Sequence, residues 1–329
     1  HTTNMMQSGG NSYIANFTNI SHFLIGYPVT KWWGGSIGLL PYSDIGYSFN
    51  SQSDAGEVFY FEGDGGLSRF YIGNGFKLSK NISFGVNTNY LFGNLSDNRK
   101  VFFVDDTYLN SRRKEESLIS GFYYDFGVII HGQLNEWKAS LGLTYNNGSD
   151  VNVERSVLAE TFRLNNLTEV LEDTVVYVTE RGKVILPTAM GLGFSASNDQ
   201  WLIAFDYNTE NWSEFQFLED SDDLGNSTKI AMGFEFTPDR RAINRYGKMI
   251  RYRFGGYMSD AYLQIEDQQL EEKSISFGLG LPLKRSGSLL NLSAEFGQRG
   301  SENLIQDNFA RFKIGLVLSD IWFIKRKYD

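Results

Sequence analysis

The amino-acid sequence predicts an all-β protein, a transmembrane up-and-down antiparallel β-barrel. Three observations predict this fold: the chain is polar on average but rich in aromatic rings, its side chains alternate with a period of two, and its connections are alternately short and long. Each is typical of a wall of strands that faces lipid on one side and a polar lumen on the other.

The composition combines many large rings with a polar average. Phe, Tyr and Trp make up 15% of the 329 residues and hydrophobic residues 41%, yet the mean hydropathy is -0.30. The sequence has no run of about 18 apolar residues, which excludes a transmembrane helix. Strands of a barrel need no such run. All-β proteins of this length form one domain, so we predict that residues 1–329 form a single outer-membrane barrel domain.

Charge and cysteine content exclude several classes of function. The formal net charge of -9 argues against a nucleic-acid partner, because binding to phosphates needs a basic surface. The chain has no Cys, which excludes disulfides, thiolate catalysis and Cys-ligated metals. The first residues, HTTNMMQSGG, lack a basic segment followed by an apolar stretch. We therefore expect the N-terminus to be mature or incomplete.

Alternation of apolar with polar or tiny residues predicts thirteen strands. The predicted strands are 13–29, 35–49, 66–78, 82–95, 116–132, 137–147, 184–197, 200–214, 228–237, 248–263, 273–283, 288–299 and 304–318. In the fifth strand Phe122, Tyr124 and Phe126 take one face, while Tyr123 and Asp125 take the other. Because the side-chain period of a strand is two, each strand has one apolar wall and one polar wall.

The connections between these strands separate into two classes. The short connections are 31–34, 79–81, 133–136, 198–199, 237–247 and 284–287. The long connections are 50–65, 96–115, 148–183, 215–227, 264–272 and 300–303. Short and long connections follow one another along the chain, which favours a meander with short periplasmic turns and long extracellular loops. A Greek-key sandwich gives no reason for this order.

The longest connection, 148–183, contains apolar residues at roughly helical spacing. These residues are Leu158, Phe162, Leu164, Leu167, Val170 and Leu171, all within Ser156–Asp173. We expect this segment to be a lid over the barrel or a helix that docks on a neighbouring protein.

Tryptophan gathers at one end of the predicted strands. Trp32, Trp33, Trp137, Trp201 and Trp322 lie at or beside short turns, and Trp212 lies at the opposite end of its strand. An indole ring prefers the boundary between acyl chains and headgroups, where its apolar body is buried and its N–H remains hydrated. The five residues therefore predict a membrane-interface girdle.

The order of the connections also makes a prediction about the number of strands. Residues 1–12 are expected to be the end of an outer loop, and an odd number of strands does not close an antiparallel meander. We therefore expect one more strand before His1, which gives fourteen strands in the complete protein.

Charged residues on the polar wall are the candidate functional residues. They are Asp44, Arg69, Asp125, Asp206, Glu235, Arg251, Arg253, Glu295, Arg311 and Lys313. The cations Arg251, Arg253, Arg311 and Lys313 are the candidate ligand-binding group, because they could contact a substrate carboxylate or an acidic plug. The alternative is that these charges pair with one another across a polar lumen.

No catalytic, cofactor or metal site is predicted. The three histidines, His1, His22 and His131, are scattered along the sequence, and none is flanked by a nucleophile motif. We predict a protein that is not an enzyme, with no cofactor and no metal. A lipid-degrading hydrolase is the one enzymatic alternative, and it would require His131.

Three segments resemble the FadL/TodX family of outer-membrane proteins, in the branch found in Bacteroidota. They are Phe23–Phe49 with its Trp-Trp turn, Ser195–Tyr207 and the terminal Trp322–Asp329. The resemblance implies a fourteen-stranded barrel with an N-terminal hatch in the lumen. In this chain the first strand and the hatch would precede His1, so they are expected to be missing.

The resemblance implies two alternative functions in the bacterial outer membrane. The first is passage of fatty acids or other hydrophobic small molecules through a lateral opening in the wall. The second is an accessory barrel subunit, with a sealed lumen, in a barrel-assembly or type IX secretion complex. The expected partners are outer-membrane lipid and lipopolysaccharide, hydrophobic small molecules, and other barrels or lipoproteins.

Overall fold

A computed structural model gives the fold of the chain. The structure describes residues 2–8, 11–18, 20–105, 107–165, 168–218, 224–242, 245–265, 268–283, 287–300 and 306–319. Within these residues, no helix is long and apolar enough to span a membrane. Eighteen strands of the described residues belong to one sheet, and all paired strands are antiparallel.

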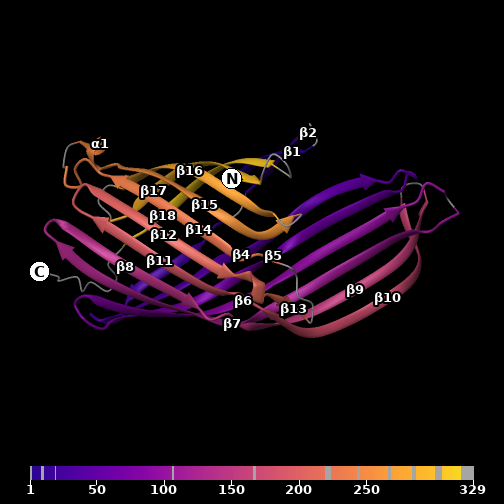
Figure 1. Cartoon of the computed structure of the whole chain (residues 1–329), viewed down its shortest axis with the longest axis horizontal. Coiled ribbons are helices and arrows are strands. Elements are labelled where there is room, and N and C mark those ends of the chain that lie inside the picture. Colours follow the sequence, from indigo (N-terminus) through magenta and orange to yellow (C-terminus); the bar gives the residue numbers. More distant parts are fainter. Residues whose placement is uncertain are drawn as a thin grey trace, which may run out of the picture.

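The sheet rolls up into a barrel with one long side (Figure 1). Its strands are β1 (Thr2–Ser8), β2 (Asn11–Phe17), β3 (Phe23–Pro28), β4 (Trp33–Gln52), β5 (Val58–Lys77), β6 (Ile82–Phe102), β7 (Asn110–Leu134), β8 (Trp137–Asn146), β9 (Asp150–Asn165), β10 (Thr168–Ile185), β11 (Thr188–Ser197), β12 (Trp201–Asn211), β13 (Gln216–Phe217), β14 (Ser227–Phe236), β15 (Arg251–Ile265), β16 (Gln268–Pro282), β17 (Leu289–Gly300) and β18 (Gln306–Val317). Two short helices, η1 (Trp212–Glu214) and α1 (Tyr246–Met249), lie in connections.

The predicted antiparallel barrel is confirmed. Each of the thirteen predicted spans contains a strand, and the first span is divided into β2 and β3. Most neighbours in sequence are also neighbours in the sheet, as a meander requires. The expected strand before His1, the total of fourteen and the hatch stay predictions.

The prediction of a long loop at 148–183 is wrong. The described residues of this segment form the β9–β10 hairpin, and no helix lies among them; Leu167 lies outside the described residues. The cause is the length of β7, which is 25 residues. The short-turn end of β7 pairs with β8 from Asp125 to Leu134, and its other half pairs with β9 from Asn110 to Ser120. The hairpin therefore extends the sheet beyond β8.

Other predicted loops are also largely strand. The connections 50–65 and 96–115 shrink to 53–57 and 103–109, because β4, β5 and β6 are 20, 20 and 21 residues long. By contrast, β14 to β18 have 10 to 15 residues each. The outer halves of β4, β5, β6 and β7, together with β9 and β10, thus form a projecting sheet, which runs into the right half of Figure 1.

The prediction that residues 1–12 belong to an outer loop is also wrong. Of these residues, the described ones form β1 and the start of β2, and β1 pairs with β18 from Thr2↔Arg311 to Gln7↔Gln306. An unpaired backbone edge is costly in a wall that faces lipid, and pairing of β1 with β18 satisfies part of that edge. The described N-terminal and C-terminal strands are therefore neighbours.

Burial identifies the two faces of the wall. On β7, Phe122 and Tyr124 are 59% and 43% exposed, whereas Tyr123 between them is 1% exposed. The register continues the inner face of Tyr123 around the barrel, and it aligns Gly34, Gly75, Gly85 and Gly127 on four successive strands. The apolar rings therefore face outward, and glycines and polar groups face the lumen.

The outer part of the lumen contains an apolar cluster. Its buried members are Leu67, Leu91, Ile119, Tyr123, Val151, Val153, Val184 and Leu186, from β5, β6, β7, β9, β10 and the residue after β10. Phe215, Phe217 and Leu218 pack against them from the connection between β12 and β14. This connection folds inward because β13 pairs with Val184 and Ile185 of β10.

Candidate functional site

Two cavities occupy the inner face of the barrel. The larger cavity, of about 610 Å³, borders the short turn at Thr30–Gly34 and extends along β5, β6, β7, β8, β11 and β12. Its wall includes seven glycines: Gly34, Gly75, Gly85, Gly127, Gly142, Gly191 and Gly193. The second cavity, of about 460 Å³, lies against β14 to β17, and Asp206 on β12 borders both.

Glycine creates the space of the larger cavity. A Cβ atom built on Gly75 meets no atom within 4 Å, and one on Gly85 or Gly142 makes only ordinary contacts. Gly193 differs, because its Cβ would lie 2.7 Å from Asp206 Oδ1. A larger side chain at Gly75 would therefore project into the open cavity.

A polar belt separates the larger cavity from the apolar cluster. Asp125 accepts hydrogen bonds from Asn89 Nδ2 at 2.9 Å and from Asn146 Nδ2 at 2.8 Å. Arg69 Nη1 donates to the Tyr123 hydroxyl at 3.2 Å, and the Tyr42 ring packs edge-on against Tyr123. These bonds join β5, β6, β7 and β8 through the lumen side of the wall.

The first charged group of the lumen wall centres on Glu235. This carboxylate is only 8% exposed, and Arg253 Nε donates to it at 2.9 Å. Arg240 Nη2 and Arg251 Nη1 lie 3.3 Å and 4.0 Å from its oxygen Oε1. Arg253 also donates to Asn291 Oδ1 at 2.7 Å. One buried carboxylate therefore holds three cations.

The second charged group joins β15 to β18 around Glu295 and Glu272. Arg311 Nη1 lies 3.0 Å from Glu295 Oε1 and 3.4 Å from Glu272 Oε1. Lys313 Nζ is 3.3 Å from Glu295 Oε2. The Tyr257 hydroxyl contacts both carboxylates, donating to Glu272 and lying 3.2 Å from Glu295 Oε1. This network forms a continuous ionic lining.

All four predicted ligand-binding cations are thus engaged with carboxylates of neighbouring strands. Arg251 and Arg253 contact Glu235, and Arg311 and Lys313 contact Glu295. The arrangement matches the alternative of internal charge pairing, and ligand binding by these residues stays a prediction. Sequence reasoning missed Glu272 because it placed this residue in a loop. The alternation Glu272, Ser274, Ser276 along β16 was the available signal.

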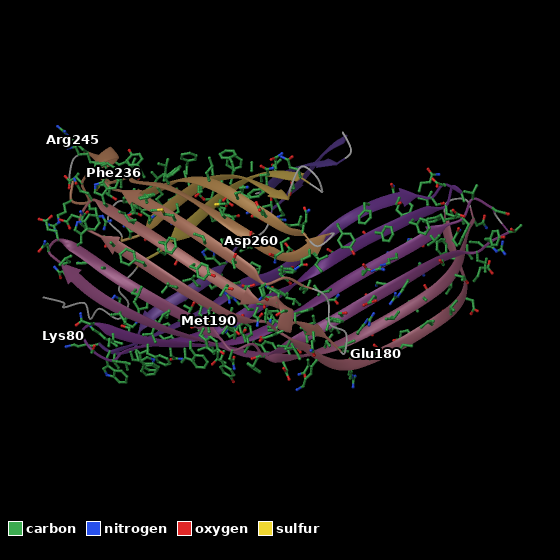
Figure 2. The ribbon with its side chains drawn as sticks, viewed as in Figure 1. Lys80, Glu180, Met190, Phe236, Arg245 and Asp260 are labelled. Atoms are coloured by element: carbon green, nitrogen blue, oxygen red, sulfur yellow. The ribbon has the colours of Figure 1, made fainter. Side chains whose placement is uncertain are left out.

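The tryptophans of the predicted girdle lie where strands begin at short turns. Trp33, Trp137 and Trp201 are the first residues of β4, β8 and β12, and Trp32 precedes β4. The Trp201 ring lies 4.5 Å from the ring of Phe236, which Figure 2 shows at the same end of the barrel as Lys80 and Arg245. Trp322 lies outside the described residues. The girdle role stays a prediction.

Trp212 lies at the opposite end, as expected. Its indole stacks on Tyr262 at 4.1 Å between ring centroids and donates to Glu210 Oε2 at 2.7 Å.

One histidine lies beside a serine. His131 Nδ1 is 3.1 Å from Ser140 Oγ, and the two residues face each other across β7 and β8. A hydrolytic dyad needs a third group that orients the imidazole. Among the described contacts, His131 has only its backbone bonded to Asn81 besides the serine and the β-ladder. His22 likewise contacts its sequence neighbour Ser21.

Comparisons with known proteins agree on the fold. The sequence model of the family described as BamG matches residues 1–329. None of the curated proteins compared matches the sequence. The P. putida toluene transporter TodX is similar in structure, with a TM-score of 0.60 and 12% identity over 95% of this chain and 85% of TodX.

Two further solved structures are similar. The Ralstonia pickettii toluene transporter TbuX has a TM-score of 0.58 and 11% identity, over 96% of this chain and 86% of its own. A Pseudomonas aeruginosa FadL homologue has a TM-score of 0.54 and 9% identity, with the same coverage. These TM-scores show that the chain shares the barrel fold of the three proteins. At identities this low, the similarity concerns the fold alone.

Proposed function

We propose a function for this chain from the premise that it belongs to the BamG family. In this proposal the chain is an accessory, non-enzymatic barrel subunit of a β-barrel assembly complex in the bacterial outer membrane. The family name supports a role in assembly, and the similarity to TodX, TbuX and a FadL homologue supports an outer-membrane barrel.

The structural observation that carries the proposal is the filled outer part of the lumen. The fully buried Leu91 and Val151, together with Tyr123, form an apolar cluster that Phe215 and Phe217 cover from the β12–β14 connection. Close packing of this kind is a structural core, because opening it would expose buried apolar surface to water. The four lumen cations of the candidate ligand-binding group are also paired with Glu235 and Glu295, so their charges are neutralised without a ligand.

Because the apolar cluster and the paired cations are engaged inside the barrel, we assign the contacts of this subunit to its outer surface. The projecting sheet, made of the outer halves of β4 to β7 with β9 and β10, gives this chain a large surface outside the membrane-crossing wall (Figure 1). We therefore place the contacts with other subunits on that sheet and on the lipid-facing wall.

Purification from the native host tests the assembly role. The tagged chain is extracted in a mild detergent, and we expect the central barrel-assembly subunit to co-purify in stoichiometric amount. Depletion of the chain should reduce the folded amounts of other outer-membrane barrels, measured by heat-modifiable migration in gels. A chain that purifies alone, and whose depletion leaves the other barrels unchanged, would overturn the proposal.

A second candidate function is passage of hydrophobic small molecules. The observation that favours it is the glycine-lined cavity of about 610 Å³, which has the volume of a small-molecule site. Saturable binding of a fatty acid or toluene to the purified chain would support this function. Absence of binding, together with unchanged uptake in a strain without the protein, would exclude it.

A further inference from the structure

Strand β10 is a free edge of the projecting sheet. On one side it pairs with β9 along its length, from Thr168↔Asn165 to Ile185↔Asp150. On the other side its described backbone partners begin at Lys183, whose carbonyl accepts a hydrogen bond from Leu218 N at 2.9 Å. β13 pairs with the next two residues. Within the described part of the chain, residues 168–182 have β9 as their only strand partner.

This edge lies outside the membrane-crossing part of the wall. β8 and β11 pair directly with each other and have ten residues each, about the length that a strand needs to cross a bilayer. β9 follows the outer end of β8, and β10 precedes the outer end of β11, so the hairpin lies beyond these two strands. Figure 2 shows Glu180 of β10 on the projecting half, farther from Lys80 than Met190 of β11 is. Apolar side chains of β10 are therefore exposed to water and not to lipid.

The exposed side chains of β10 are unusually apolar for a water-facing edge. Val175 and Tyr177 are 62% and 71% exposed, and Val178 is 44% exposed. Natural proteins protect such edges with Pro, Lys or bulges. The strand has no Pro, and its single Lys, Lys183, is bonded to Asp150 at 3.1 Å. Its two register shifts lie between Leu171 and Val176, so the ladder is regular from Val176 onward.

The backbone groups that point outward can be identified. The N–H and C=O of one residue point to the same side of a strand, and successive residues alternate. The Lys183 carbonyl points to the free edge because Leu218 binds it. By alternation along the regular ladder, Tyr177, Thr179 and Arg181 also present their N–H and C=O groups outward. These groups are a template for another strand, as β13 demonstrates on the same edge.

The charges beside this edge specify the chemistry of the occupant. Glu180 is half exposed, and its nearest cation, Arg155, is 3.9 Å away and already donates to Glu115 at 2.7 Å. Asp173 is also exposed. In contrast, Arg181 is neutralised by Glu154 at 2.8 Å. The edge therefore offers a negative charge that is only weakly neutralised, that of Glu180, beside apolar Val and Tyr side chains.

We propose that the edge of β10 from Val176 to Arg181 binds an extended segment of another outer-membrane subunit by adding it as an antiparallel strand. The segment carries apolar residues that alternate with Lys or Arg. Main-chain hydrogen bonds supply the affinity, and the alternating side chains supply the specificity. The strand addition itself rests on the free edge and its neighbouring charges, and the assignment of its occupant to another subunit rests on the proposed function.

A matched pair of variants tests this strand addition on the full chain in detergent. Thr179→Pro removes one outward N–H and leaves the ladder with β9 intact, whereas Thr179→Val keeps that N–H. The probe is a short fluorescent peptide in which Val and Tyr alternate with Lys and Arg, measured by anisotropy. We expect equal binding to the natural chain and to Thr179→Val, and binding to Thr179→Pro weaker by about tenfold.

Further probes keep the test decisive if Thr179→Pro fails to fold. The same peptide with alternate residues N-methylated should bind the natural chain at least about tenfold more weakly, because one peptide edge loses its donors. A peptide with Asp and Glu in place of Lys and Arg should also bind more weakly. The proposal is overturned if the basic peptide does not bind saturably, if the N-methylated or acidic peptides bind equally well, or if Thr179→Pro breaks a dimer of the chain, since the occupant is then a second copy.

Discussion

Glu235 on β14 and Arg253 on β15 are direct register partners, and Arg253 Nε donates to the Glu235 carboxylate at 2.9 Å. The pair links two adjacent strands on the lumen side of the wall. Because Arg240 and Arg251 also lie within 4.0 Å of the same carboxylate, a single negative charge on Glu235 contacts three cations.

Replacing Glu235 by Gln should therefore destabilise the barrel. The variant leaves partly buried guanidinium groups without their counter-charge, and loss of a hydrogen bond to a charged group costs about 1.5–3 kcal/mol. We expect a lower midpoint of urea unfolding in detergent, followed by tryptophan fluorescence. The control is Glu271→Gln, since Glu271 is 60% exposed and its ion-pair partner among the described residues is the exposed Lys273. Equal midpoints for the two variants would contradict the prediction.

A large side chain at Gly75 should fill the glycine-lined cavity without disturbing the wall. A Cβ there meets no atom within 4 Å, so Gly75→Leu should fold with a midpoint within about 1 kcal/mol of the natural chain. Any hydrophobic ligand of the cavity should then bind more weakly by tenfold or more, measured by fluorescence of a dye such as phenylnaphthylamine. Gly132→Leu is the matched control, because Gly132 is equally unhindered but does not line the cavity. Equal dye binding by both variants would place the ligand elsewhere.

Acid should weaken the projecting sheet through Asp97. Burial raises the pKa of this carboxyl, but hydrogen bonds from the Tyr47 hydroxyl at 2.6 Å and Arg99 Nε at 2.7 Å outweigh burial and lower the pKa below its ordinary value. A lowered pKa in the folded state stabilises the fold above the unfolded pKa of about 3.9. That contribution is lost as the pH falls through the lowered folded pKa.

Thermal unfolding between about pH 5 and pH 2 should measure this effect. We expect the natural chain to lose more stability over this interval than Asp97→Asn, which has no carboxyl to protonate at this position. Parallel curves for the two proteins would show that Asp97 does not contribute.

Quenching by brominated lipids should distinguish the two ends of the barrel. In a variant that retains only Trp201, lipid bromines near the headgroups should quench the fluorescence strongly, because the girdle places this ring at the interface. A variant that retains only Trp212 should be quenched much less, since this ring stacks on Tyr262 at the outer end. Equal quenching of both variants would remove the argument for a girdle.

Side-chain alternation was sufficient to predict the membrane-crossing strands. A strand with one lipid face must alternate, as Phe122 to Phe126 do, so its residues carry the signal locally. The β9–β10 hairpin also alternates at Val151–Glu154, but the apolar residues from Leu158 to Leu171 fit a helix equally well. The strand conformation of the hairpin is favoured by the outer half of β7, from Asn110 to Ser120, which β8 does not reach and which therefore pairs with β9. This part of β7 is distant in sequence, so a local pattern does not reveal the pairing.

The lumen charges show the same limit. Alternation places Glu235, Arg253, Glu295 and Arg311 on the inner wall, but it does not reveal which charges meet. That depends on the register between strands, which pairs Glu235 with Arg253 and Glu295 with Arg311. Glu272 was missed because strand β16 begins at Gln268, five residues before its predicted start at residue 273. Register and strand length follow from pairing over the whole sheet.

The chain leaves and re-enters the membrane-crossing wall at one point. Asn146 ends β8 and is the register neighbour of Ala189 on β11, so the wall is already closed beneath the forty or so residues between them. The β9–β10 hairpin is therefore an insertion whose two ends meet. It is a natural graft position, at which one external module can be exchanged for another, in evolution or by design, without re-threading any strand through the bilayer.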